Sequence, residues 1–117
     1  MAKLPKYMGS MLHVYRKYVT RAAERNIEFN IDITIFKITC EKDCYYCGAS
    51  PTSSKDHDRY NGAWKYNGLD RTDNSKGYIE SNIQPCCTLC NRLKSNMKET
   101  DFLNHIAKIM EKRKTHG

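Results

Sequence analysis

The stretch that decides the fold reads NGLDRTDNSKGYIESNIQPCCTLCNRLK and runs from residue 67 to residue 94. Within it, Leu69–Arg71 has the pattern of a short strand end, and Ile79–Cys86 has that of a return strand. The segment 72–77 between them contains Asp and Asn, which bond locally, and ends on a Gly that tolerates positive φ. We therefore predict a β-hairpin, followed by a helix that begins at Cys87 and runs to about residue 97.

Two C-x-x-C pairs have the spacing of zinc ligands. They are Cys44-Tyr-Tyr-Cys47 and Cys87-Thr-Leu-Cys90. Each pair places two sulfurs on one side of a tight turn or of the first turn of a helix, and two pairs complete a tetrahedron. We predict one structural zinc ion here, with disulfide bonds or free core thiols as the alternatives. The two other cysteines, Cys40 and Cys86, are predicted to be small core residues.

The composition indicates a small basic domain. The chain has 117 residues, of which 39% are hydrophobic, and so small an apolar share leaves a domain marginal without a metal or cysteine staple. Lys and Arg number 20 while Asp and Glu number 13, which gives a net charge of +7. This charge fits a polyanionic partner, usually nucleic acid, and a basic surface that only confers solubility is the alternative.

No run in the sequence approaches the roughly 20 apolar residues that span a bilayer, so we expect no membrane association. Residues 1–6 also lack the apolar run of a signal peptide. The expected location is therefore the cytoplasm. Thiols stay reduced there, which favours metal binding over disulfides.

Two helices are predicted to flank the hairpin. Residues 10–25 place apolar side chains at three- and four-residue spacing, and residues 100–113 do the same. The apolar stripe of the second helix consists of Leu103, Ile106, Ala107 and Met110. We divide the chain into an N-terminal helical or extended arm, residues 1–39, and a zinc-bound domain with a C-terminal helix, residues 40–117.

Two further segments are less regular. Residues 26–39 alternate like a strand, but Asp32 or Thr34 could also cap a short helix there. Residues 50–67 are polar and interrupted by Pro and Gly, which predicts an excursion on the surface.

The order of these motifs closely resembles that of HNH endonucleases, and more narrowly their zinc-bound, phage-type branch. That branch shows a C-x-x-C-G knuckle, an Asp-His or Asp-Arg pair at a strand end, a G-Y-x-x-x-N turn and a C-x-x-C-N-x-x-K helix start. The match covers about residues 44–109. It implies an α+β fold, a small zinc-stabilised ββα-metal (His-Me finger) core with flanking N- and C-terminal helices. It also implies metal-dependent hydrolysis of DNA phosphodiester bonds.

The residues of a catalytic metal site follow from the same stretch. Asp70 closes a strand, and Asn91 lies about 100° around the helix from the zinc ligand Cys90, so it could face the hairpin. A carboxylate and an amide oxygen suit a hard cation, Mg²⁺ or Mn²⁺, and leave room for a phosphodiester. The alternative is a turn Asp and a surface Asn that bind nothing.

One position departs from the usual HNH pattern. Arg71 occupies the place of the His that acts as general base, and Arg stays protonated. We assign Arg71 to the scissile phosphate, which its planar fork can bind. His57 is our first candidate for the base, because an ordinary His pKa near 6.5 suits the role. Tyr66 and a water on the metal are the alternatives, and a phenol with an ordinary pKa of about 10 needs activation.

Asn82 occupies the middle Asn position of the family, and we expect it to hold the hairpin by side-chain-to-backbone bonds. Four basic residues near the site are candidates for contacts with phosphates, or form only a solvated face. They are Lys76, Arg92, Lys94 and Lys98. Analogy with double-strand cutters of this size favours a homodimer. The competing function is a catalytically inactive, HNH-derived zinc module that binds DNA.

Overall fold

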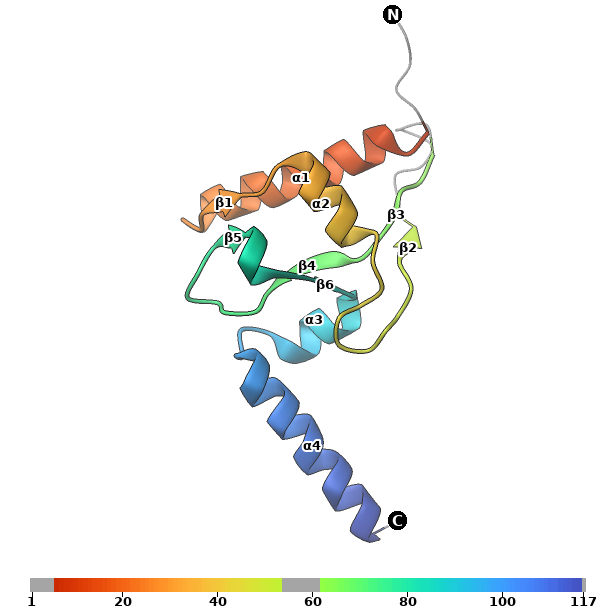
Figure 1. The fold of residues 1–117 in the computed structure, drawn as a ribbon, viewed down its shortest axis with the longest axis vertical. Helices are drawn as coiled ribbons and strands as arrows, with labels where there is room; N and C mark the ends of the chain where they lie inside the picture. Colours follow the sequence, from red (N-terminus) through yellow and green to blue (C-terminus); the bar gives the residue numbers. More distant parts are fainter. Residues whose placement is uncertain (1–5, 54–61, 117) are drawn as a thin grey trace, which may run out of the picture.

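The computed structural model describes residues 6–53 and 62–116, which form a small α+β structure (Figure 1). The elements are α1 (Met8–Glu24), β1 (Phe29–Asn30), α2 (Ile33–Cys40), β2 (Thr52–Ser53), β3 (Lys65–Tyr66), β4 (Gly68–Arg71), β5 (Tyr78–Ile79), the 3₁₀ turn η1 (Glu80–Asn82), β6 (Ile83–Cys86), α3 (Thr88–Lys94) and α4 (Glu99–His116). The strands form three pairs, β1 with β5 in parallel and both β2 with β3 and β4 with β6 antiparallel.

The predicted hairpin–helix unit is present. Strands β4 and β6 pair with Asp70 opposite Gln84, and α3 follows directly after β6. Cys87 caps α3, because its sulfur accepts a hydrogen bond from the Cys90 amide at 3.4 Å. The helix ends earlier than expected, at Lys94. This unit sets the ends of β4 and α3 close to each other.

The return strand is shorter than predicted. Residues 80–82 form the turn η1, and β5 before it leaves the hairpin to pair with β1. The cause is the buried amide of Asn82, which donates to the carbonyls of Asp73 at 3.0 Å and Gly77 at 2.9 Å. These bonds hold the chain in a turn, within the stretch that we predicted to be one continuous return strand.

Segment 26–39, for which the sequence allowed a strand or a short helix, contains a strand followed by a helix. A two-residue strand, β1, is followed by α2, whose first turn is capped by Asp32. The Asp32 carboxylate accepts from the Ile35 amide at 2.9 Å, which satisfies one of the free donors at the helix start.

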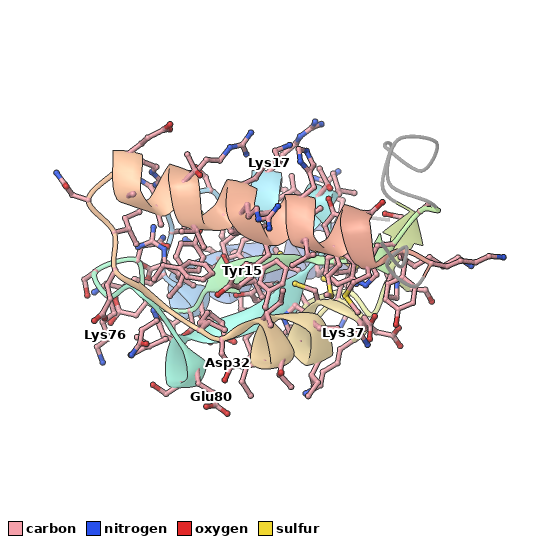
Figure 2. The ribbon with its side chains drawn as sticks, turned by 90° about the horizontal axis from the view of Figure 1, so that it is seen from above. Tyr15, Lys17, Asp32, Lys37, Lys76 and Glu80 are labelled. Atoms are coloured by element: carbon pink, nitrogen blue, oxygen red, sulfur yellow. The ribbon has the colours of Figure 1, made fainter. Side chains whose placement is uncertain are left out.

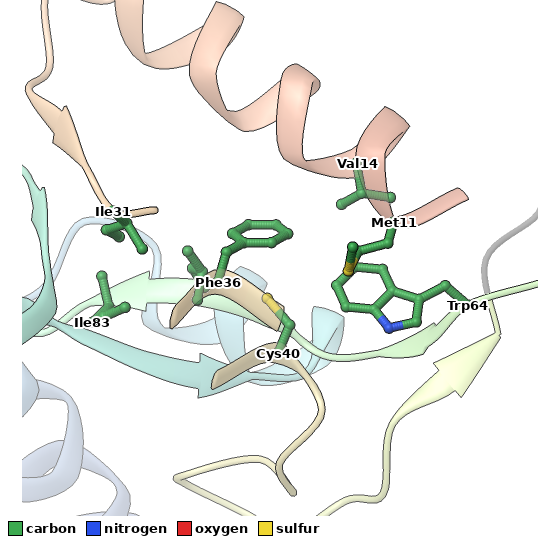
Figure 3. Packing of buried hydrophobic residues seen from close by; sticks show 8 residues of the cluster. Met11, Val14, Ile31, Phe36, Cys40, Trp64 and Ile83 are labelled. Atoms are coloured by element: carbon green, nitrogen blue, oxygen red, sulfur yellow. The ribbon is translucent and has the colours of Figure 1, made fainter. Parts of the chain in front are cut away.

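One core joins α1, α2 and the hairpin (Figure 3). Its buried members are Met11, Val14, Ile31, Phe36, Cys40, Trp64, Leu69 and Ile83. The cluster therefore contains residues of both predicted segments, 1–39 and 40–117. Helix α2 crosses the predicted boundary between these segments. Tyr15, which lies beneath α1 in Figure 2, adds edge-on ring contacts with Phe29 and Phe36.

The predicted surface excursion is wrong in its last residues. Trp64 is 2% exposed, packs in the core and donates its indole N–H to Glu41 at 2.8 Å. Asn67 is also buried, and its amide donates to the carbonyls of Lys42 and Ala49. The Gly and polar residues around Trp64 and Asn67 are typical of a surface segment. The partners that bury the two side chains lie in α2 and in the loop after it, so the local sequence did not indicate them.

Helix α4 extends away from the remainder of the molecule (Figure 1). Within residues 99–114, Phe102 is the one buried side chain, and its ring packs edge-on against Tyr46 at a centroid distance of 5.3 Å. The predicted apolar stripe of this helix is exposed at Leu103, Ile106 and Met110.

Candidate active site

The four cysteines of the two C-x-x-C pairs converge. Their sulfur atoms all lie within 4.8 Å of one another, and the Sγ atoms of Cys47 and Cys87 are 3.7 Å apart. A tetrahedral zinc ion with Zn–S distances of about 2.3 Å would hold sulfurs about 3.8 Å apart. The structure contains no disulfide bond among the six cysteines, so it gives no support to the disulfide alternative. The cluster therefore fits a metal ion such as zinc.

The pKa values of the clustered cysteines are shifted in both directions. Burial raises the pKa of Cys44, but hydrogen bonds from backbone amides, that of Cys87 first, outweigh it and lower the pKa to about 6. Burial and the neighbouring thiols raise the pKa of Cys90. Four thiolates packed this closely repel one another unless a cation lies among them, and a thiolate is the form that binds metal.

The carboxylate of Asp70 is held from both sides. Its side chain lies at the end of β4 and is 4% exposed. The Tyr46 hydroxyl donates to Oδ2 at 2.7 Å, and the Lys94 ammonium donates to Oδ1 at 3.2 Å. Tyr46 lies between two of the clustered cysteines and Lys94 ends α3, so the cysteine loop and the helix together fix this carboxylate.

Lys94 does not face solvent. It is fully buried, and besides Asp70 its ammonium donates to the carbonyl of Arg71 at 3.2 Å. The prediction that Lys94 contacts phosphate is therefore wrong, because its charge is already paired inside the protein. Burial and the accepting carboxylate of Asp70 raise the pKa of Tyr46, so this hydroxyl stays a donor.

Asp70, Arg71 and Asn91 line one cavity of about 420 Å³, which the hairpin and α3 share with α1. Three basic residues of the N-terminal segment also line it: Lys17 and Arg21 of α1, and Arg25, which follows the last residue of that helix. A second cavity, of about 790 Å³, shares Asn91 and the residues Lys17 and Arg21 with the first and adds Arg92. We call the two cavities together the basic groove. Lys17 lies on the solvent side of α1 (Figure 2).

Arg71 is partly engaged by the turn. Its Nη1 donates to the carbonyls of Asn74 at 3.1 Å and Lys76 at 2.9 Å, and its guanidinium lies over the Tyr78 ring. These contacts direct the side chain along the hairpin. The N–H groups on Nε and Nη2 can donate hydrogen bonds to a phosphate. Lys76 itself is exposed at the edge of the molecule (Figure 2).

Asn82 lies at the other end of the turn. Its side-chain oxygen accepts from the Thr72 hydroxyl at 2.8 Å and the Asp73 amide at 3.0 Å, while its nitrogen donates to two carbonyls. All of these partners belong to residues 72–77. The Asn82 side chain thus stabilises the turn that follows Arg71.

Of the candidates for a general base, one can be placed. His57 lies outside the described residues, whereas Tyr66 lines the basic groove with its ring stacked on Trp64 at 4.7 Å. Sequence reasoning did not single out Tyr18, which also lines the groove and whose hydroxyl accepts from the Leu69 amide at 3.0 Å. Burial raises the pKa of Tyr18, so it retains its proton. Its only sequence signal was its place in the apolar pattern of α1.

The hairpin, α3 and the cysteine cluster define a fold of the HNH type, as the sequence predicted. The solved structure of PacI, described as a rare-cutting HNH restriction endonuclease that perturbs DNA, has this fold. It superposes with a TM-score of 0.62 and 19% sequence identity, over 97% of this chain and 95% of that one. The chain therefore has an HNH-like, α+β fold.

Sequence comparison gives a relative of unknown activity. The uncharacterised protein R423 of Acanthamoeba polyphaga mimivirus is 37% identical over 84 residues. The match includes 72% of this chain, and the chain spans 14% of the length of that viral protein. No protein-family model matches the chain. In the described part of the chain, no helix has both the length and the apolar character of a membrane span.

Proposed function

We propose that this protein is a metal-dependent endonuclease that hydrolyses phosphodiester bonds of DNA. The observation that carries the proposal is the convergence of Asp70, Arg71 and Asn91 on one cavity beside the basic residues of α1. The HNH-like fold that it has in common with PacI, an enzyme acting on DNA, supports the same substrate.

The proposal assigns two kinds of metal ion. Structural zinc is held by the four-cysteine cluster, in a reducing compartment such as the cytoplasm that keeps the thiolates available. Mg²⁺ or Mn²⁺ is held by Asp70 and Asn91 and would polarise the phosphate and stabilise the leaving oxygen. The Asp70 carboxylate has about four lone-pair sites, of which Tyr46 and Lys94 use two, so it fits this role.

The other residues of the groove bind the substrate backbone. Arg71 donates to the scissile phosphate and stabilises the charge that grows on it in the transition state. The basic side chains of α1 and Arg92 bind flanking phosphates and set the register of the duplex. Lys76 and Lys98 do not line either cavity and are assigned no contact.

Binding and nicking of a supercoiled plasmid test this function. We expect affinity for duplex DNA to fall steeply with rising salt, because Lys and Arg displace condensed counterions. We expect nicking when Mg²⁺ or Mn²⁺ is added and none when only zinc is present. The metal is varied by addition to dialysed protein, since a chelator would also strip the cysteine cluster.

The same assay separates the two candidate functions. Salt-sensitive binding without nicking at any divalent concentration would identify the inactive DNA-binding module instead. Absence of binding at low salt would reject both.

A pair of variants tests the general base. His57→Ala is expected to lose rate and the rise in rate with pH near neutrality, because a base acts only when deprotonated and His ordinarily titrates near pH 6.5. Tyr66→Phe is expected to keep that pH profile. If Tyr66→Phe loses the rise in rate with pH and His57→Ala keeps it, Tyr66 is the general base. If neither variant changes the pH profile, water near the metal takes the proton.

A further inference from the structure

Helix α4 presents an apolar face that no part of the described chain covers. Leu103, Ile106, Ile109 and Met110 are 43%, 38%, 49% and 53% exposed. Large apolar side chains gathered at helical spacing on one exposed face mark an interaction surface more often than scattered ones do. We call these four residues the α4 stripe.

The spacing of the α4 stripe is that of a helix–helix seam. Leu103, Ile106 and Met110 follow one another at intervals of three and four residues, and Ile109 flanks them. In proteins, most of the stability of a helix comes from the packing of its apolar face and not from the helix propensity of its residues. Phe102 is the one buried side chain of residues 99–114, so a partner that covers the remainder of α4 would stabilise this helix.

The charges of α4 identify that partner. Residues 99–106 contain two acidic residues and no Lys or Arg, whereas residues 107–116 contain four basic residues and one acidic residue. In an antiparallel pair of identical helices, each acidic start lies beside the basic end of the other. A parallel pair would place like charges together, and the helix dipoles also favour the antiparallel arrangement.

We propose that α4 packs antiparallel against α4 of a second copy of this chain, with the α4 stripe as the seam. The link 95–98 between α3 and α4 is short, so the pairing would carry two basic grooves on one particle, related by a two-fold axis. Self-association in this form stands whether or not the groove cleaves DNA.

Analytical ultracentrifugation of the full-length, zinc-loaded chain tests the pairing. The wild type is expected to be dimeric, and Leu103→Asp is expected to weaken dimerisation by about tenfold or more, because a charge would be buried in the seam. Leu93→Asp is the matched control, because Leu93 is 60% exposed but lies on α3. It should remain dimeric, and all three chains should bind equal amounts of zinc.

Salt distinguishes the orientation of the two helices. The antiparallel dimer is expected to weaken as ionic strength rises, since screening removes its favourable charge pairs. A dimer that strengthens with salt would show the parallel arrangement and contradict the proposal. A wild-type chain that stays monomeric at about 1 mM, the weak limit of specific association, would overturn it, as would an unchanged Leu103→Asp dimer.

Discussion

Replacement of Cys90 by serine is expected to unfold the protein, and stripping of zinc by a chelator should do the same. Structural zinc contributes about 10–16 kcal/mol in small zinc domains. A folded domain of this size retains only about 5–15 kcal/mol in total. Around the cysteine cluster the structure has a small secondary core and little else, so loss of the metal cannot be compensated there.

Circular dichroism and elemental analysis measure this result. The wild type should contain one zinc per chain, and Cys90→Ser should lose both the zinc and the cooperative thermal transition. Cys86→Ala is the matched control, because Cys86 is buried beside the cluster but is not one of the four converging sulfurs. A stable, zinc-free Cys90→Ser chain would refute the assignment.

Asp70→Asn is expected to abolish nicking. The loss should exceed the 10–100-fold effect that removal of an outer-shell partner of a metal ligand typically has, because Asn lacks the charge that attracts Mg²⁺. Asn91→Ala should act in the same direction. Asp73→Asn is the control, because this carboxylate bonds within the turn, to the Ser75 amide at 2.9 Å, and does not line the cavity.

Asp70 variants should also lose stability, through Lys94. Breaking a buried ion pair from one side costs about 3–5 kcal/mol, since an uncompensated charge is left inside the protein. Asp70→Ala is therefore expected to fail by unfolding, and even Asp70→Asn should melt earlier.

The double variant Asp70→Asn with Lys94→Met separates the two effects. It should recover thermal stability relative to Asp70→Asn while remaining inactive and unable to bind Mn²⁺ in the absence of DNA. Nicking at the wild-type rate by either Asp70 variant would show that the metal lies elsewhere.

The cysteine cluster and the hairpin–helix unit could be predicted from sequence because their spacing imposes local geometry. A C-x-x-C pair fixes two sulfurs within one turn, and the Asp-Asn-rich segment before Gly77 turns the chain back whatever surrounds it. Asp70 lies near the end of the first hairpin strand, and Asn91 directly follows the second C-x-x-C pair. The local geometry of the hairpin and of the cysteine pair therefore places both residues at the same cavity.

The features that sequence reasoning missed depend on distant segments. Lys94 reads as a surface lysine on a short helix, and only the position of Asp70 beneath α3 explains its burial. Trp64 stands among polar residues, yet it packs on α2 and α1. Tyr46 had no signal of its own apart from its place between two cysteines.

The separation of the core residues along the chain also determines when this protein can fold. Met11 of α1 packs in the same cluster as Ile83 of β6, and the sulfurs of Cys47 and Cys87 are 40 positions apart in sequence. During synthesis, α1 and α2 leave the ribosome long before the hairpin that completes their core. We therefore expect folding to wait until Cys90 has emerged, with metal capture closing the long loop in the step that commits the chain to its native topology.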